Sequence, residues 1–550
     1  MPQSRPMLPQ KRPSRTAAPR RSYATMKRWS VFATRAVTLL AVIPAARLSS
    51  QQPASQGRSA YEELQTFSGV LNHIRVNYVD SVTYAQLVRA AIDGVLHSLD
   101  PHSRFESYAD HDKAGKLERG ELAVTGLVLE DVDGAASVLA VLAKSPADKA
   151  GIQPGDRLTL VNDTTIAGLD PQAVELRLAG EKGSKVRLRF ERGSRLEPDT
   201  FSVTLKREFV ETPSVSIVRL ADLQTGYVRL EEFGEKAGSE VHDAIRRLRG
   251  QGAARFILDL RRNPGGVVTA AVELASEFFP KHTVVFRTRG RKKDVDTTYT
   301  TKHDGDFADM PLIVLIDGGS ASAAEALAAT LQDHDRALLL GRRSFGKALI
   351  QTGFLTPQGD VVWLTIGRVI TPSGRFIQRR YRGLRYEEYR EFGGVGGAGE
   401  DTLEVFHTDH GRPVRGGGGI APDVELPRPA AVPVWWSAAS DSGLDAGVAD
   451  SFASTLPATP AARAAWMSAR AEWQAKLVAP FVERVRGRFH IAAQPDSMLA
   501  ARIARNLAIR VAEVRWGADA RDEFLVRNDP DVRAALDYFP RLEQLLSAPK

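Results

Sequence analysis

The sequence is organised around one stretch, Asp317 to Gln351, which reads DGGSASAAEALAATLQDHDRALLLGRRSFGKALIQ. The apolar run 311–316 before it predicts a buried parallel strand, and a helical pattern begins at about Ala323. A serine at this turn would face unpaired N–H groups and the positive end of a helix, which can hold a developing oxyanion. A second strand, 337–341, leads to Ser344-Phe-Gly-Lys347, whose amine can return to the same edge. The stretch therefore offers a serine and a lysine.

A lysine in an apolar site can serve as a base for such a serine. Desolvation disfavours the charged amine, so its pKa falls and it can accept a proton. Serine–lysine pairs are a known variant of the catalytic triad. Gly265 and Gly266 follow the predicted strand 255–260, and glycine lets a backbone N–H approach a reacting carbonyl closely. Spacing alone leaves the choice between Ser320 and Ser322 open.

Composition limits the classes of function. The 550 residues carry a net charge of +8, but residues 1–50 hold ten Lys or Arg and no acid, so the remainder has a charge of −2. The basic excess lies in the leader, and we expect no nucleic-acid partner. The chain has no cysteine, and its eleven histidines form no HExxH pattern. We therefore expect no disulfide, no metal and no other cofactor.

The first 50 residues predict a secretory signal. Met26-Lys-Arg28 begins a basic region, and residues 36–43 form a short apolar region. Both Met1 and Met26 remain candidate starts, and the cleavage site is open. We expect export to the periplasm or cell envelope of a bacterium. The apolar run is too short for a good membrane span, although an uncleaved leader could still tether the protein.

Residues 60–121 show helical spacing, with a turn at Asp100-Pro101-His102-Ser103. Asp and Ser are natural helix caps, and proline imposes an extended or turn geometry. We favour this structural interpretation over a catalytic or metal-binding one.

Residues 122–208 predict a β-rich module that resembles a PDZ domain. Its signature is the segment 145–156, followed by a strand and Asn162-Asp163. PDZ domains bind a peptide C-terminus as an added strand. The resemblance places the carboxylate-binding loop at Gly126, Leu127 and Val128, and the groove beside Val174 and Leu178 of a helix 171–178. A spacer module without a ligand is the alternative.

Residues 209–428 alternate strands and helices, which predicts a parallel or mixed sheet with crossover helices. Residues 391–399 form a Gly-rich loop. Residues 429–550 predict a helical extension of unassigned role, which leaves a homo-oligomer open. We expect its arginines to form a solvated face, namely Arg502, Arg505, Arg510 and Arg515.

Ordered motifs give the chain a family resemblance. They are Leu99-Asp-Pro-His-Ser103, Asn263-Pro-Gly-Gly266, Gly319-Ser-Ala-Ser-Ala-Ala-Glu325, Ser344-Phe-Gly-Lys347 through Gln351, and Gly417-Gly-Gly-Ile-Ala-Pro-Asp423. With the PDZ module, they resemble the C-terminal processing peptidases, or tail-specific proteases, over about residues 60–425. The resemblance implies an α/β multidomain fold, with a mixed sheet and crossover helices in a ClpP/crotonase-like core, an inserted PDZ domain, and helical terminal segments.

The resemblance also implies roles for individual residues. Ser322 becomes the nucleophile, Lys347 the general base and Gln351 the residue that orients the lysine. If the local backbone is helical, the spacing of Lys347 and Gln351 puts both side chains on one face. The N–H of Ala323 and of one glycine, Gly265 or Gly266, would form the oxyanion hole. For two acids, we favour a turn or cap at Asp317 and a first-turn helix acid at Glu325.

These inferences predict an exported serine endopeptidase that uses a Ser–Lys dyad to cleave proteins near their C-termini. Its partners would be protein substrates with exposed tails, which the PDZ domain would bind while gating activity. The alternative is a non-catalytic PDZ scaffold that keeps the protease fold.

Overall fold

The structure is a computed structural model that describes residues 59–132, 135–142, 144–153, 155–167, 169, 171–192, 199–210, 213–382, 389, 404–491 and 493–546. The predicted leader 1–50 and the Gly-rich loop 391–399 lie outside the described residues. The chain divides into two units, and the boundary in the sequence lies between Val76 and Asn77. Among the described residues, no helix is both long enough and apolar enough to cross a membrane.

Helices α1 and α2 confirm the helical spacing near the N-terminus. Helix α1 (Ala60–Asn77) has no buried side chain at any of its residues, all of which are described. In the second unit, α2 (Tyr84–Leu99) begins with a capping box between Thr83 and Gln86. Strand β1 (Arg104–Glu106) and helix α3 (Tyr108–Glu118) follow.

The turn after α2 confirms the structural role of Asp100. Its Oδ1 accepts the backbone N–H groups of His102 and Ser103, each at 2.8 Å, and its Oδ2 accepts the Ser103 hydroxyl at 2.7 Å. The carboxylate therefore holds the turn together.

The β-rich module has a sheet with the strand order β2-β3-β4-β6-β7 in the described chain, with β5 on β4. Its elements are β2 (Leu127–Val132), β3 (Ala135–Val141), α4 (Pro146–Lys149), β4 (Arg157–Val161), β5 (Thr164–Thr165), α5 (Pro171–Leu178), β6 (Lys185–Arg192) and β7 (Asp199–Lys206). Entry and exit of the module are paired, because Val124 and Glu208 exchange backbone hydrogen bonds of 2.9 and 3.0 Å. The two chain connections of the module therefore lie side by side.

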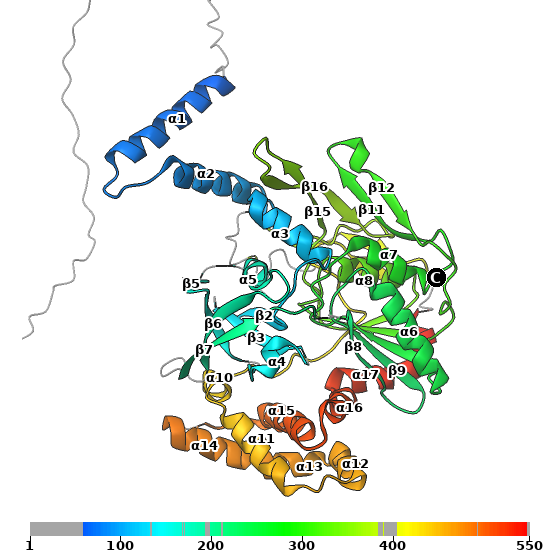
Figure 1. Cartoon of the computed structure of the whole chain (residues 1–550). Coiled ribbons are helices and arrows are strands. Elements are labelled where there is room, and N and C mark those ends of the chain that lie inside the picture. Colours follow the sequence, from blue (N-terminus) through cyan, green and yellow to red (C-terminus); the bar gives the residue numbers. More distant parts are fainter. Residues whose placement is uncertain are drawn as a thin grey trace, which may run out of the picture. The chain divides into compact units, whose positions relative to one another are not determined.

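A second sheet forms the centre of the region that follows the β-rich module (Figure 1). Its order in the described chain is β19-β14-β13-β10-β9-β8, and all neighbours are parallel except the β8–β9 pair. The strands are β8 (Val215–Leu220), β9 (Thr225–Leu230), β10 (Arg255–Asp259), β13 (Leu312–Ile316), β14 (Leu338–Gly341) and β19 (Val424–Glu425). This confirms the predicted alternation of strands with crossover helices.

Helices cover both faces of this sheet. One face packs against α6 (Ala237–Gly250), α7 (Val268–Ser276) and α8 (Ala323–Asp333), and the other packs against C-terminal elements. Those elements are α17 (Pro530–Tyr538), the 3-10 turn Phe539–Arg541 and α18 (Leu542–Leu546). The C-terminal extension therefore contributes one of the two layers that cover this sheet.

A further sheet carries the order β1-β16-β11-β12 in the described chain, with β15 on β16. Its later strands are β11 (Val284–Gly290), β12 (Thr297–Thr300), β15 (Leu349–Leu355) and β16 (Val361–Ile370), and a 3-10 turn at Lys293–Val295 precedes β12. Strands β17 (Val405–His407) and β18 (Pro413–Arg415) pair separately.

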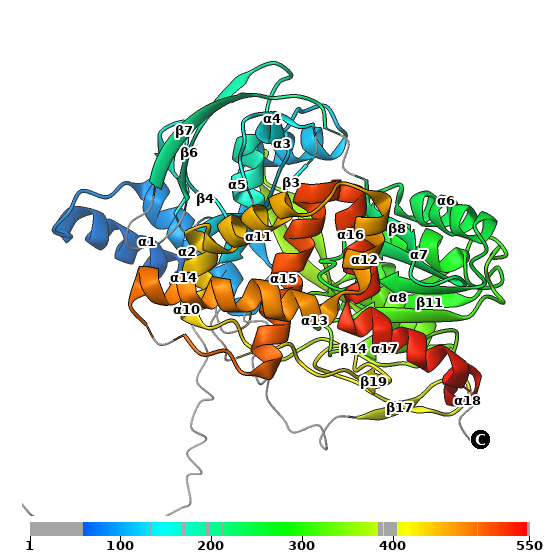
Figure 2. The same ribbon diagram turned by 90° about the horizontal axis from the view of Figure 1, so that it is seen from below.

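The helices between β19 and α17 share one apolar core (Figure 2). They are α10 (Val434–Asp441), α11 (Leu444–Thr455), α12 (Pro460–Ser468), α13 (Arg470–Trp473), a π-turn at Gln474–Val478, α14 (Ala479–Phe489), α15 (Ser497–Trp516) and α16 (Ala518–Asn528).

The arginines of α15 do not form a solvated face, so that prediction was wrong. All are partly buried. Arg510 pairs with Asp450 at 2.7 Å, Arg502 donates to the Ala430 carbonyl, and Arg505 lies 3.8 Å from Asp529. Helical periodicity places these residues beside the apolar stripe, where Arg505 and Arg510 meet acids of other segments.

Substitutions on the two faces of β14 test this packing. Leu339 faces the α6–α8 layer and Leu340 faces the α17 layer, and both are 0% exposed. Because each replacement removes buried methyl groups, Leu339→Ala and Leu340→Ala should each lower the free energy of unfolding by roughly 2–5 kcal/mol in urea titrations. Leu223→Ala, at a side chain that is 90% exposed, is the control. A negligible loss for Leu340→Ala alone would contradict the docking of α17.

Candidate active site

Three neighbouring strands deliver the candidate residues to one edge of the sheet. Strand β13 lies between β10 and β14, and all three are parallel. Their carboxyl ends lead to Gly265 and Gly266, to Ser322, and to Lys347, respectively. In open parallel sheets this is the edge where ligand sites form.

The two serines of the turn have different environments. Ser320 is 0% exposed, and its hydroxyl donates to the Leu260 carbonyl at 2.7 Å and accepts the Asp317 N–H at 2.9 Å. Ser322 is partly exposed and begins α8 with φ of 55°. Non-glycine residues rarely adopt this backbone conformation, which is found at functional sites. Ser322 is thus the serine available for chemistry.

The carboxylate of Glu325 joins the serine turn to the lysine loop. Its Oε2 accepts the backbone N–H of Ser322 at 3.0 Å and that of Lys347 at 2.8 Å. Its Oε1 accepts the Ser344 hydroxyl at 2.5 Å and the Gly346 N–H at 2.6 Å. Glu325 is 0% exposed. It lies in the first turn of α8 as predicted, but it also connects two loops, which the interpretation as a simple first-turn acid missed.

Burial controls the ionisation of both groups. Burial raises the pKa of Glu325 to about 7, although hydrogen bonds from Ser344 and from backbone N–H groups act in the opposite direction. Burial also lowers the pKa of Lys347, and Arg104 adds to this effect, whereas the charge of Glu325 opposes it. The neutral form of the amine is therefore more accessible than in water.

Gln351 does not lie in a helix with Lys347, because β15 begins at Leu349 and contains Gln351. Its Nε2 donates to the Thr365 hydroxyl of β16 at 3.2 Å. The conditional helical spacing is thus corrected to a strand. A role for Gln351 in orienting the lysine stays a prediction.

The glycine loop packs directly against the serine turn. A Cβ at Gly265 would lie 2.7 Å from Ser322 Cβ and 2.9 Å from the Ala323 nitrogen, so only glycine fits. The N–H of Gly265 donates to Asn263 Oδ1 at 2.9 Å. The exposed Gly266 donates its N–H to no group in the described part of the chain, and the Ala323 N–H lies in the first helical turn.

Asp317 has the turn role that its position predicted. Its Oδ1 accepts the N–H groups of Arg262 at 2.8 Å and Gly319 at 2.9 Å. These bonds connect the ends of β10 and β13, and they confirm a structural role.

A polar network adjoins the lysine. His102 Nε2 lies 2.9 Å from the Tyr389 hydroxyl, which accepts from Gln378 Nε2 at 3.2 Å. Gln378 Oε1 in turn accepts the Ala348 N–H at 2.8 Å. Burial and the charge of Lys347 lower the pKa of His102 to about 4, against the effect of Asp100. The imidazole is therefore neutral at pH 7.

The residues predicted for peptide binding lie around β2. A Cβ on Gly126 would lie 2.1 Å from Ser145 Cβ, which fixes a tight loop ahead of Leu127 and Val128. In the described chain β2 pairs only with β3, so its other edge is unpaired. Val174 and Leu178 face the module's own core, at 0% and 3% exposed. Their part in a groove stays a prediction.

Among the described residues, no group of three His, Asp or Glu side chains could hold a metal ion. Sequence reasoning missed the residues that connect distant loops. Only the Ser-x-x-Glu spacing of a capping box hinted at Glu325.

The chain is similar to known proteins in sequence and in structure. A model of peptidase family S41 matches residues 224–385, and a PDZ domain model matches residues 137–192. A solved photosystem II D1 C-terminal processing protease is 26% identical, with 67% of this chain and 87% of that chain covered and a TM-score of 0.42.

Two bacterial relatives establish the family. A carboxy-terminal-processing protease of Bartonella bacilliformis is 33% identical over 329 residues, which cover 58% of this chain and 74% of that protein. A carboxyl-terminal-processing protease of Synechocystis is 34% identical over 298 residues, which cover 52% of this chain and 68% of that protein. The chain, with its mixed α/β core and PDZ module, therefore belongs to peptidase family S41, the family of the carboxy-terminal-processing proteases.

Proposed function

We propose that this S41 peptidase is an exported serine endopeptidase that cleaves proteins near their C-termini with a Ser322–Lys347 dyad. One observation carries the proposal: the backbone N–H groups of both residues bind one oxygen of the buried Glu325 carboxylate. Their nitrogens lie 3.0 and 2.8 Å from that oxygen, so the backbone segments that carry the proposed nucleophile and base are held beside each other. The predicted leader supports export to a bacterial periplasm or envelope.

The reaction is acyl transfer followed by hydrolysis. Ser322 Oγ attacks the scissile carbonyl carbon while neutral Lys347 Nζ accepts its proton. The N–H groups of Ala323 and Gly266 stabilise the oxyanion; Gly266 is favoured because Asn263 already engages the Gly265 N–H. When the C–N bond breaks, Lys347 returns the proton to the leaving amine. Water then gives a proton to Lys347 and attacks the ester carbonyl. As the C–O bond to Ser322 breaks, Lys347 returns that proton to Ser322 Oγ, and the acid is released.

The PDZ module would supply the preference for chain ends. The unpaired edge of β2 can accept a peptide as an added strand, and the loop at Gly126 can place backbone N–H groups on its carboxylate. Since the module joins the chain at the Val124–Glu208 pair, it can move as a unit and gate the site.

The alternative is a non-catalytic scaffold that keeps the fold and uses only the PDZ module. In such a scaffold the arrangement of Ser322, Lys347 and Glu325 would have no function. The buried carboxylate, the lowered pKa of Lys347 and the backbone of Ser322 together favour the enzyme.

Replacing either dyad residue should abolish cleavage. Ser322→Ala and Lys347→Ala should each lower kcat by at least about a thousandfold on casein or on a peptide with an apolar C-terminus, because neither partner acts alone. Lys292→Ala, at an exposed lysine, is the matched control. Equal cleavage by wild type and both dyad variants would favour the scaffold.

The pH profile should report on the amine. Protonated Lys347 cannot accept the serine proton, so kcat should rise with pH through the lowered pKa of Lys347. Ionised Glu325 raises that pKa, so Glu325→Gln should move the midpoint of the rise to lower pH and reduce the plateau. The measurement is kcat from pH 5 to 10. A rate independent of pH, or an upward shift in Glu325→Gln, would argue against a lysine base.

Removal of the PDZ module tests tail recognition. A variant lacking residues 122–208 should lose the preference for a peptide with a free terminal carboxylate over its amide. The preference should be roughly ten- to a hundredfold in wild type, as hydrogen bonds to a charged group imply. Gly126→Ala, whose Cβ would collide with Ser145, should weaken the same preference. An unchanged rate and unchanged tail preference in the deletion variant would remove this role.

A further inference from the structure

The C-terminal extension reaches the ends of the strands that carry the active site. Helix α17 packs on the sheet face opposite α8, with Val532 at 1% and Ala535 at 0% exposed, and Phe539 of the following 3-10 turn is 8% exposed. This packing fixes the first turn of α17, which holds Asp531, near the ends of β10 and β14. Asp529 caps the helix and accepts the N–H groups of Asp531 and Val532 at 2.8 and 3.1 Å.

One partner of Asp531 belongs to the glycine loop. Arg261 follows β10 and is five residues from Gly266. Its Nη1 donates to Asp531 at 2.8 Å and to Asp529 at 3.1 Å. Its other nitrogens bind Asp259, and burial would raise the pKa of that carboxyl, but Arg261 and Arg229 hold it at about 2. The start of the glycine loop is therefore held by an Arg261–Asp259 ion pair that stays charged at neutral pH.

The second partner belongs to the lysine loop. Arg342 follows β14 and is five residues from Lys347. It binds Asp531 in a bidentate manner, with Nη2 to Oδ1 at 3.0 Å and Nη1 to Oδ2. The Asp531 side chain is 9% exposed, and those of Arg261 and Arg342 are 12% and 17% exposed. Water therefore screens these pairs only partly.

Asp531 thus spans the end of β13, the strand that leads to Ser322. Strands β10 and β14 flank β13, so they are separated by two strand spacings, or about 10 Å. A single carboxylate therefore holds the loops on both sides of the serine turn at the same level along the strand direction.

We propose that Asp531 is a positioning residue that holds the oxyanion loop and the lysine loop in register around Ser322. Through Asp531, one helix of the C-terminal extension contacts the two loops beside Ser322. The inference rests on the proposed dyad. Without this link the loops keep their hydrogen bonds to Glu325 and Asn263, but their separation is no longer fixed at the outer edge. A misplacement of about 1 Å in such a site can cost about a hundredfold in rate.

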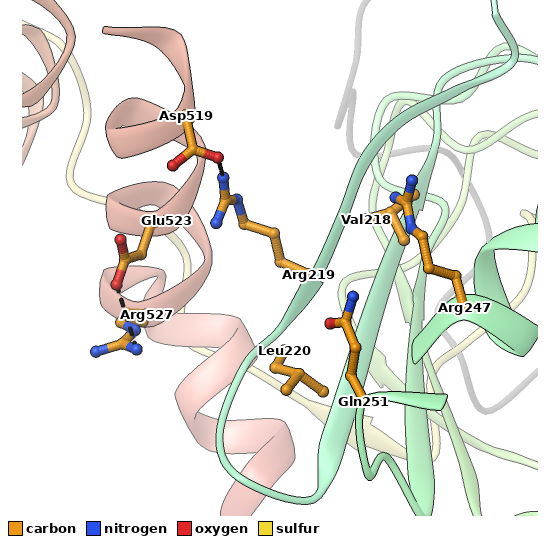
Figure 3. Close-up of a pocket in the computed structure, with 8 residues that line it drawn as sticks. All are labelled: Val218, Arg219, Leu220, Arg247, Gln251, Asp519, Glu523 and Arg527. Carbon is orange, nitrogen blue, oxygen red and sulfur yellow. Dashed lines mark hydrogen bonds and ion pairs between the residues drawn. The ribbon is translucent and has the colours of Figure 1, made fainter. Parts of the chain in front are cut away.

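The same extension offers a matched control. Figure 3 shows Arg219 of β8 reaching Asp519 of α16, beside a cavity of about 430 Å³ that Glu523 and Arg527 also line. Asp519 also pairs with Arg463 at 2.6 Å. The Arg219–Asp519 ion pair joins the C-terminal extension to β8, an edge strand of the sheet. The cavity shares no lining residue with the candidate site. Asp519→Asn therefore removes an interface pair without touching either loop.

The experiment compares full-length Asp531→Asn, Arg342→Gln, their double variant and Asp519→Asn on an internally quenched peptide with an apolar C-terminus. Asp531→Asn should lower kcat roughly ten- to a hundredfold with KM within about twofold of wild type. Arg342→Gln should have a similar effect, and the double variant should be no worse than the single ones, because both remove one link. Asp519→Asn should keep the wild-type kcat. In each case, circular dichroism and the unfolding midpoint give the fraction of folded enzyme, and kcat is expressed per folded enzyme.

A kcat per folded enzyme within twofold of wild type in both Asp531→Asn and Arg342→Gln would overturn the inference. So would an equal loss in Asp519→Asn, which would indicate a general effect of the interface. If Asp531→Asn does not fold, Arg342→Gln decides alone by the same criterion. Ser322→Ala in the same assay separates the two claims: if it cleaves like wild type, the proposed dyad itself fails and this inference with it. If it is inactive while Asp531→Asn is not impaired, only the inference fails.

Discussion

The site depends on one buried carboxylate. Glu325 accepts hydrogen bonds from Ser322, Ser344, Gly346 and Lys347 while it is 0% exposed. Its removal would leave four buried or partly buried donors without a partner, each at a cost of about 1–3 kcal/mol. The carboxylate therefore sets where the lysine loop lies relative to the serine turn, and the remaining contacts refine that placement.

Two electrostatic effects around this carboxylate act on the pKa of Lys347 in opposite directions. The amine of Lys347 must lose its proton at moderate pH, and burial together with Arg104 favours this. Ionised Glu325 opposes it, but burial raises the pKa of Glu325 to about 7. His102 stays neutral near pH 7 because its pKa is about 4, so it adds no charge beside the lysine. The Glu325 carboxylate can thus accept these hydrogen bonds without supplying a full counter-charge that would keep Lys347 protonated.

Sequence reasoning reached the parts of the fold that depend on local pattern. The apolar runs of β10, β13 and β14 and the glycines after them are visible in the sequence, and parallel strands bring their carboxyl ends to one edge. Contacts between distant segments could not be predicted. The capping spacing of Glu325 gave no sign of the loop 19 to 22 residues away, and the spacing of Lys347 and Gln351 fits a helix as well as the observed strand. Asp531 lies about 190 residues from Arg342, so nothing local links them.

The most direct test of the central claim is covalent labelling of the serine. Wild-type protein treated with a fluorophosphonate probe, digested and analysed by mass spectrometry should carry one adduct, on Ser322, and its rate of formation should increase with pH. Lys347→Ala should form this adduct at a greatly reduced rate at every pH. An adduct on another serine, or equal labelling of Ser322 in the wild type and Lys347→Ala, would contradict a serine activated by this lysine.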